Sequence, residues 1–412
     1  MLARRSRLWA AIASLLAGSI SPAAHAGSVD VPALTAAYNA SGQALYAELA
    51  RAPGNIVLSP YSIGSAMAMA RTGARGETET QMTAVLRHTL AREAADAANA
   101  ALLKMLNRYD GSAAAPARLD AANALMLAKR GGVIAPGYRA LVQEKYAAGV
   151  HEGATLDTVN DWVKQRTDGK IDSILDELPE NAAAVLLNAV YLKATWAQRF
   201  IAKATSEADF KLSPTQKVPV PTMHRQAMYR LAERAGYRAI RLDYTARGLG
   251  MIVVLPNDLD GVDAVARTAD AGEIKALRTA LGEGQPKLVA VALPRFKAAY
   301  KASLAKLFRL AGMTLAFDDK ADFAGMTGTG ASVPGVKIGP CLHRATVEVG
   351  EEGTEAAAAT AVVIMERSAP AAKGQARVPI PFVVDRPFLF YIVDDASGAI
   401  LFQGRIADPR AS

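Results

Sequence analysis

Apolar residues recur at helical spacing along the first half of the chain. Spaced Leu and Tyr residues predict an amphipathic helix over residues 31–52. Ser59-Pro60 is a typical helix start, and the Ala- and Met-rich run after it predicts a buried helix that closes at Gly73. The pattern predicts further helices at 77–86, at 158–169, near 261–281 and at 302–313, and an Ala-rich helix followed by a loose segment within 90–130.

Strand patterns dominate the second half. The apolar run 184–196 predicts a buried strand, in which the polar Asn188 needs hydrogen-bond partners. Short strands with turn residues fill 210–256, and 287–298 predicts another strand. Two apolar runs on either side of 394–398 predict a hairpin, beside which Asp394 and Asp395 are expected to be solvated. Helices followed by strands indicate an α+β fold.

The stretch 351–368, EEGTEAAAATAVVIMERS, fits neither pattern cleanly. Its alanines favour helix, whereas the β-branched residues after them favour strand. With a period of two, one face is small or apolar throughout, and consists of Thr354, Ala356, Ala358, Thr360, Val362 and Ile364. Glu355 lies on the opposite face. The stretch is therefore either an alanine-rich linker or a peptide able to bend at Gly353 and enter a sheet.

The first 26 residues are typical of a secretory signal peptide. Three arginines precede an apolar run from Leu8 to Ala17, and Ala24-His25-Ala26 provides small residues for cleavage. The apolar run is too short to span a membrane. Removal of this segment takes away three of the eight excess positive charges and leaves +5. We expect a mature chain of residues 27–412 that is secreted or periplasmic.

Composition excludes several function classes. No Lys- or Arg-rich run lies beside aromatic residues, so no nucleic-acid partner is expected, and no later apolar run reaches the length of a membrane span. Cys341 is the only cysteine, so no intramolecular disulfide can form. The histidines lack metal-ligand spacing and no catalytic motif is present. Only Cys341 near His343 hints at a nucleophile, so we expect no enzyme, cofactor or metal.

Several segments together resemble the serpin family of serine protease inhibitors across nearly the whole mature chain. They are NIVLSPYSI, LLNAVYLKATW, KVPVPTM, LPRFK, ADFAGMTG, HRATVEVGEEGTEAAAAT and RPFLFYIVDDASGAILFQGRI. The resemblance implies one domain over 27–412, with three β-sheets, eight or nine helices and an exposed reactive-centre loop at about 351–380. It also implies an inhibitory, secreted member of bacterial type that is a monomer and forms a covalent acyl-enzyme complex with its protease.

The resemblance also assigns roles to residues of the loop. The hinge comprises Glu351, Glu352, Gly353, Thr354, Glu355, Ala356, Ala357, Ala358 and Ala359. The scissile residue of inhibitory members usually lies fourteen positions after the hinge glycine, which selects the bond Arg367–Ser368. Arginine there favours a trypsin-like protease with an acidic primary pocket, and Glu366 and Met365 are the alternatives.

Five further residues match positions that control opening of the main sheet in this family. Ser59, Ser62, Asn188 and His343 match a hydrogen-bonded cluster beneath the sheet, and Trp196 matches the point where insertion starts. Core packing would explain the same residue types. The alternative function is a non-inhibitory serpin that acts as a binding or chaperone protein, and a hydrolase built on Cys341 and His343 is a third hypothesis.

Overall fold

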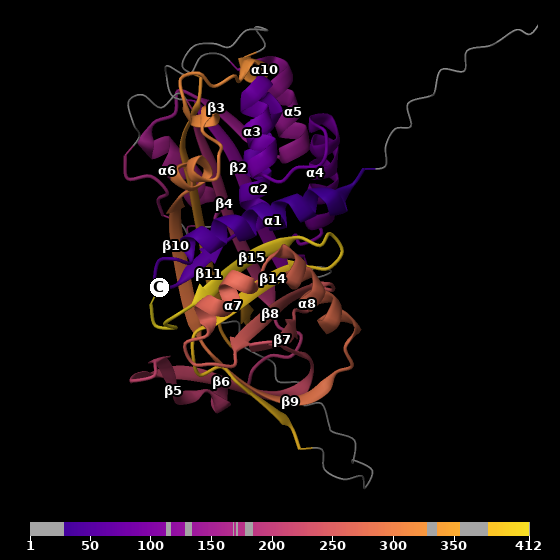
Figure 1. Ribbon diagram of the computed structural model, residues 1–412, viewed down its shortest axis with the longest axis vertical. Coiled ribbons are helices and arrows are strands. Elements are labelled where there is room, and N and C mark those ends of the chain that lie inside the picture. The colour runs from indigo at the N-terminus through magenta and orange to yellow at the C-terminus, as the bar shows by residue number, and fades with distance from the viewer. Residues whose placement is uncertain are drawn as a thin grey trace, which may run out of the picture.

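The computed structural model describes residues 29–112, 117–127, 134–167, 169, 172–177, 184–327, 336–354 and 378–411. The molecule is elongated, with most helices in its upper half, α7 and α8 lower down near β14 and β8, and three sheets running through it (Figure 1). Its α-helices are α1 (Val31–Leu49), α2 (Pro60–Gly73), α3 (Gly76–Val85), α4 (Arg92–Leu106), α5 (Pro136–Tyr146), α6 (Leu156–Arg166), α7 (Val262–Thr268), α8 (Ala271–Glu283), α9 (Ala305–Leu310) and α10 (Ala324–Thr327). Two 3-10 turns are η1 (Ala202–Ala204) and η2 (Leu315–Phe317).

Side-chain caps explain where the main helices begin. Asp30 accepts a hydrogen bond of 2.9 Å from the backbone N–H of Ala33 at the start of α1. Ser59 caps α2 in the same way, by accepting from the N–H of Ser62 at 3.2 Å. Every residue of α2 is buried, so the small Ala and Ser residues of this helix let the surrounding elements approach it on all sides.

The strands form three sheets, two of which share one long strand. They are β1 (Ile56–Leu58), β2 (Ala117–Leu127), β3 (Gly149–Glu152), β4 (Ala184–Thr195), β5 (Ser206–Ser213), β6 (Gln216–Arg234), β7 (Tyr237–Asp243), β8 (Leu249–Pro256), β9 (Lys287–Pro294), β10 (Phe296–Ser303), β11 (Ile338–Val349), β12 (Gly353–Thr354), β13 (Ile380–Val383), β14 (Phe388–Asp394) and β15 (Ile400–Ile406). The first part of β6 pairs with β5 and β9, and its last five residues pair with β7, so β6 joins two sheets into the order β1-β15-β14-β8-β7-β6-β9-β13.

The third sheet has the order β10-β11-β12-β4-β2-β3 and runs along the long axis of the molecule. Its strand β2 lies where the sequence predicted only a helix and a loose segment. The alanine-rich residues of 117–127 have low strand propensity, but β2 pairs with β4 at eleven positions. That tertiary pairing outweighs local preference.

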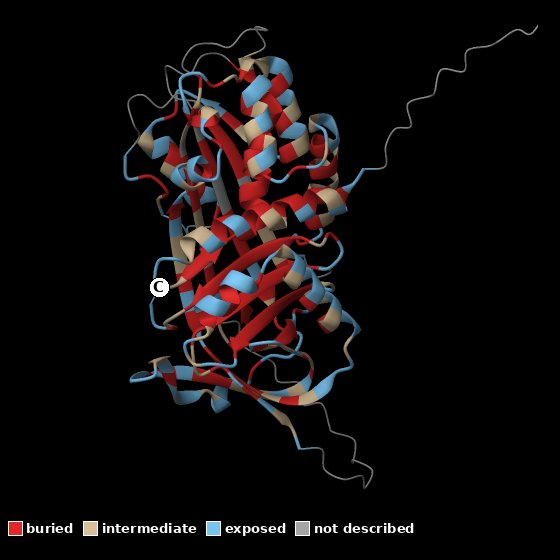
Figure 2. Ribbon diagram, in the orientation of Figure 1, coloured by how far each residue is buried: buried red, intermediate tan, exposed pale blue. Residues whose placement is uncertain are grey.

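Two apolar clusters lie on the two faces of this sheet. The larger one joins buried side chains of α2 to those of the sheets, and these buried stretches are red in Figure 2. The smaller one joins Ala124, Met126, Leu187 and Leu342 of the sheet to Val159, Trp162 and Val163 of α6. Helix α6 therefore covers the outer face of the sheet over β2, β4 and β11.

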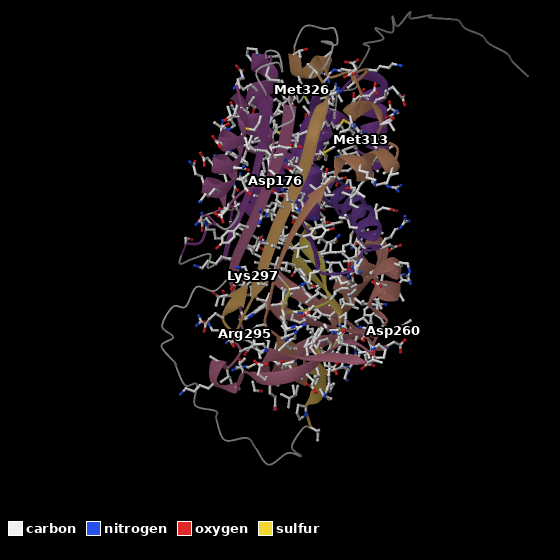
Figure 3. The ribbon with its side chains drawn as sticks, turned by 90° about the vertical axis from the view of Figure 1, so that its left-hand side faces the viewer. Asp176, Asp260, Arg295, Lys297, Met313 and Met326 are labelled. Atoms are coloured by element: carbon white, nitrogen blue, oxygen red, sulfur yellow. The ribbon has the colours of Figure 1, made fainter. Side chains whose placement is uncertain are left out.

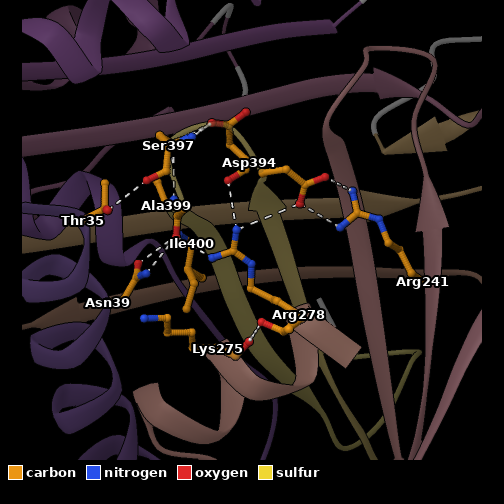
Figure 4. Close-up of polar contacts among 12 residues, drawn as sticks. Thr35, Asn39, Arg241, Lys275, Arg278, Asp394, Ser397, Ala399 and Ile400 are labelled. Carbon is orange, nitrogen blue, oxygen red and sulfur yellow. Dashed lines mark hydrogen bonds and ion pairs between the residues drawn. The ribbon is translucent and has the colours of Figure 1, made fainter. Parts of the chain in front are cut away.

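The predicted hairpin is confirmed as β14 and β15, but the prediction that Asp394 is solvated was wrong. Its carboxylate is fully buried and binds Arg108, the Tyr109 hydroxyl at 2.6 Å, and the Ser397 hydroxyl at 2.6 Å. Arg278 donates to the Asp394 carbonyl oxygen, and the polar contacts of this turn are drawn in Figure 4. Arg108 and Tyr109 lie just after α4 and Arg278 lies in α8, so these partners are distant in sequence and local patterns cannot reveal them.

The α+β class and the three sheets are confirmed. The described residues contain ten α-helical segments against the eight or nine expected, and α10 among them has only four residues. None of the helices in this part of the chain has the length and apolar character needed to cross a membrane.

Candidate functional site

The six-stranded sheet is open at one end and closed at the other. From Ile338 to Ala345, β11 pairs directly with β4 in parallel. Beyond that point the two strands separate, and β12 lies between them. Thr354 is opposite Val349 of β11 on one side and Ala194 of β4 on the other. The first two residues of a further strand thus already occupy the gap.

Gly353 fits this gap only because it lacks a side chain. A Cβ at this position would collide with the carbonyl oxygen of Ala194 and would lie 2.8 Å from the Cα of Thr195. The chain reaches β12 through a tight turn in which Gly350 and Gly353 exchange backbone hydrogen bonds of 3.0 and 3.3 Å. Glycine at 353 is therefore required for the chain to approach β4 this closely.

Thr354 is buried and bound from the core side. Its hydroxyl lies 2.5 Å from the phenolic oxygen of Tyr244, whose pKa is raised by burial so that the phenol stays protonated. The ring of Tyr244 stacks on Trp196 with 4.4 Å between centroids. The indole Nε1 of Trp196 donates to the Gly350 carbonyl oxygen at 2.9 Å. Trp196, predicted to mark the start of insertion, is therefore in contact with the turn that leads into β12.

Charged contacts hold the two glutamates of the turn. Glu351 accepts hydrogen bonds from Arg295 Nε at 2.7 Å and from the Thr205 hydroxyl at 2.6 Å. Burial alone would raise the pKa of Glu351, but the hydrogen bonds from Arg295 and Thr205 hold it below its ordinary value. Glu352 forms an ion pair of 2.8 Å with Arg199. Figure 3 shows Arg295 near the lower end of the long sheet.

A second polar cluster lies where β11 and β4 are still paired. His343, Asn188 and Asn123 occupy one row across β11, β4 and β2. His343 is fully buried, and its Nε2 accepts a hydrogen bond of 3.2 Å from the Ser59 N–H at the start of α2. Burial lowers the pKa of His343 to about 3, so the ring is neutral at physiological pH.

Asn123 belongs to this cluster and was missed in the sequence. Its side chain donates to the Ser65 hydroxyl at 3.1 Å, one turn of α2 beyond Ser62. The sequence contains the pattern that could have identified this residue, because Asn123 interrupts an apolar run in the same way as Asn188. The structure thus brings Ser59, Ser62 and His343 together beneath the sheet, with Asn188 next to His343 in register.

The reactive bond Arg367–Ser368 and the hinge residues Glu355, Ala356, Ala357, Ala358 and Ala359 lie outside the described residues. The described chain ends one side of the loop at Thr354 and resumes at Val378, two residues before β13. Within the described residues, no group of three or more His, Cys, Asp or Glu side chains could hold a metal ion.

The alternative of a thiol nucleophile at Cys341 does not fit the geometry. Cys341 is buried, its Sγ lies 3.7 Å from the Met67 sulfur, and burial raises the pKa of its thiol to about 12. A thiol with that pKa stays protonated at physiological pH and is a poor nucleophile. His343 already accepts the Ser59 N–H, so it is not positioned as the base for Cys341.

Comparison with known proteins identifies the family. A sequence profile described as Serpin (serine protease inhibitor) matches residues 36–409. The chain belongs to the serpin family. Leukocyte elastase inhibitor of Bos taurus is 33% identical over 378 residues, which cover 86% of this chain and 93% of that protein. A serine protease inhibitor of Cyanea capillata is 30% identical over 368 residues, covering 87% of this chain and 93% of that protein.

Solved serpin structures have the same fold. Serpin48 of the insect Tenebrio molitor superposes with a TM-score of 0.77 at 27% identity, and the match covers 93% of this chain and 99% of that one. Human thyroxine-binding globulin superposes with a TM-score of 0.79 at 23% identity and covers 92% of this chain, which shows likeness of fold. This serpin thus belongs to a family of protease inhibitors that are not themselves enzymes.

Proposed function

We propose that this serpin is a secreted suicide inhibitor of trypsin-like serine proteases that is cleaved at Arg367–Ser368. The protease serine attacks the Arg367 carbonyl carbon, the bond to the Ser368 nitrogen breaks, and the new amine leaves with a proton. The acyl group stays on the protease. Insertion of the cleaved loop between β4 and β11 then carries the protease away and distorts it before water can hydrolyse the ester.

The position of β12 is the observation that carries this proposal. Thr354 lies opposite Ala194 of β4 and Val349 of β11. A strand continued from Thr354 would run antiparallel to both, so each later loop residue would pair with the next earlier residue of β4 and of β11. Thr360 would then come between Asn188 and His343, which are paired with each other in the present structure. Insertion therefore has to separate the row of polar residues that β11 and β4 now share.

The same register accounts for the run of small residues in the loop. Residues on the Thr354 face would point to the core, and those on the Glu355 face would point outward. Ala361 would come between Leu187 and Leu342, both of which pack in the cluster that α6 covers. A strand that passes between a close-packed core and a helix needs small side chains on both faces, and 356–359 are all alanine.

A direct test is incubation with trypsin followed by denaturing electrophoresis. We expect a covalent complex that survives denaturation, together with a released peptide that begins at Ser368 by mass spectrometry. Quantitative loop cleavage without any complex, and without a rise in melting temperature of the cleaved chain, would instead support the non-inhibitory binding protein. Recovery of the chain from the culture medium or the periplasm, beginning at Gly27, tests the proposed signal peptide.

A further inference from the structure

One end of the molecule exposes an apolar surface that the fold does not use. Strands β13, β9 and β6 lie side by side there, and their outward side chains form rows in which Val383 and Pro381 of β13 flank Ala292 and Ala290 of β9. Ile201, next to η1, borders the same hollow of about 460 Å³. We call this surface, together with Met228 further along β6, the β13–β9–β6 face; its strands lie at the lower end of Figure 1.

The apolar exposure of this face is unusual for this molecule. Six large apolar side chains are strongly exposed among the described residues. Ile201, Met228 and Val383 belong to the face, with 50%, 49% and 45% of their surface accessible, and Val378 lies two residues before β13. Exposed apolar patches of this kind mark interaction surfaces.

The place of the face in the chain indicates its partner. Strand β13 is the edge strand of its sheet and begins two residues after Val378, where the chain returns from the loop. Ser368 is ten residues before Val378, which is at most about 35 Å of extended chain. A protease domain of roughly 230 residues is on the order of 40 Å across. A protease bound at Arg367 is therefore within reach of this face.

Charged residues around the face indicate which groups a partner would place against it. Asp209 and Asp385 at the rim of the hollow are already paired, at 2.5 Å with Lys217 and at 2.8 Å with Lys211. Lys203 in η1 and Lys287 at the start of β9 form no ion pair with any residue that the structure describes, so the charge left over at the rim is positive. The face suits an apolar side chain that has carboxylates beside it.

We propose that the β13–β9–β6 face is a second contact surface for the target protease and receives an apolar side chain flanked by carboxylates on that protease. The proposal rests on the proposed inhibitory function. It adds an explanation of how the inhibitor would distinguish one trypsin-like protease from another. Arg367 admits every protease with an acidic primary pocket, and this face selects among them by speeding the encounter with those that carry the complementary patch.

The test compares rates of covalent complex formation across a panel of proteases that cleave after arginine, trypsin among them. The double variant Ile201→Glu/Val383→Glu and the single variant Met228→Glu place carboxylates on half-exposed positions of the face. Leu310→Glu, on α9 and 70% exposed, is the matched control. We expect the face variants to react at least tenfold more slowly with at least one protease, with unchanged stoichiometry and melting temperature, and the control to stay within twofold of the wild type.

The outcomes separate this inference from the function on which it rests. If the wild type traps proteases and both face variants react within twofold of it with every member of the panel, the contact surface is refuted and the inhibitory function stands. If the wild type traps no protease at all, the proposed function is refuted and this inference with it. Slowing by Leu310→Glu to the same degree would also overturn the assignment, because the effect would then be one of net charge.

Discussion

The hydroxyl of Thr354 lies 2.5 Å from the phenolic oxygen of Tyr244, inside the gap between β4 and β11. Thr354, which the sequence predicts to belong to the hinge, is thus bound to the core in the uncleaved chain. Tyr244 in turn stacks on Trp196, which holds the preceding turn at Gly350. In the proposed mechanism, entry of the loop would begin at this point and would require the paired parts of β4 and β11 to separate.

Charge at position 354 should disable the trap. Thr354→Glu would bury a carboxylate beside the protonated hydroxyl of Tyr244, at a cost in solvation of the charge. We expect trypsin to cleave this variant as a substrate, with the covalent complex reduced at least tenfold on denaturing gels. Thr354→Ser keeps the hydroxyl and should retain the complex. Equal complex yields for the Glu and Ser variants would contradict a role for position 354 in loop insertion.

A bulky residue at position 361 should obstruct insertion further along the sheet. If the register of β12 continued, this residue would come between Leu187 and Leu342 under α6. We expect Ala361→Trp to raise the number of inhibitor molecules consumed per protease severalfold, because slow insertion gives water time to hydrolyse the acyl-enzyme. Lys373→Trp serves as the control, because position 373 follows the proposed scissile bond and would not insert. A stoichiometry unchanged by Ala361→Trp would contradict the register.

The proposed scissile bond can be checked by paired substitutions. Arg367→Ala should abolish complex formation with trypsin, whose acidic pocket requires a basic side chain. Lys373→Ala should leave it intact. If instead Lys373→Ala abolished the complex and Arg367→Ala did not, the reactive bond would lie in the distal part of the loop. The amino-terminal residue of the released peptide gives the same answer independently.

Acid should destabilise the protein partly through His88. This side chain is buried near Arg71 and neither ring nitrogen has a hydrogen-bond partner among the described residues. Burial, with a smaller effect of Arg71, lowers the pKa of His88 from 6.5 to about 3. The unfolded chain thus binds a proton at His88 more readily than the folded chain does. The contribution of neutral His88 to the free energy of unfolding is therefore full above pH 6.5 and is lost as the pH falls towards 3.

The expected size of this effect at pH 5 is about 2 kcal/mol from one histidine. His88→Phe should therefore lose less free energy of unfolding than the wild type between pH 7 and pH 5 in denaturant titrations, by about that amount. Phenylalanine preserves an aromatic edge against Tyr38, whose ring packs on His88 at 5.9 Å between centroids. Identical pH slopes for the two proteins would exclude His88 as a source of acid lability.

Removing the charge of Asp394 should destabilise the whole fold. Its buried carboxylate binds Arg108, Tyr109 and Ser397, so Asp394→Asn leaves Arg108 without its counter-ion. We expect a loss of about 3 kcal/mol or more in the free energy of unfolding. Asp176→Asn, on an exposed pair with Lys301, should cost less than about 1 kcal/mol. Comparable losses of unfolding free energy in the two variants would show that the buried ion pair of Asp394 stabilises the fold no more than an exposed pair does.

Local patterns in the sequence were sufficient for most helices and for the strongly apolar strands. The cap at Ser59, the strand containing Asn188 and the hairpin of β14 and β15 all lie where the sequence predicts them. Strand β2 was missed, because its alanine-rich segment has helical propensity and becomes a strand through pairing with β4. Asn123 was missed with it.

The sequence by itself determined the family, the alternation of small residues after Gly353 and the candidate bond at Arg367. These follow from composition and order along the chain, which local chemistry and resemblance can interpret. Only the tertiary structure decided that Thr354 already lies between β4 and β11 and that Asp394 is a buried anion. Contacts with residues more than a hundred positions away, Ala194 for Thr354 and Arg108 for Asp394, set both, and no local preference records which distant strand or cation a residue will meet.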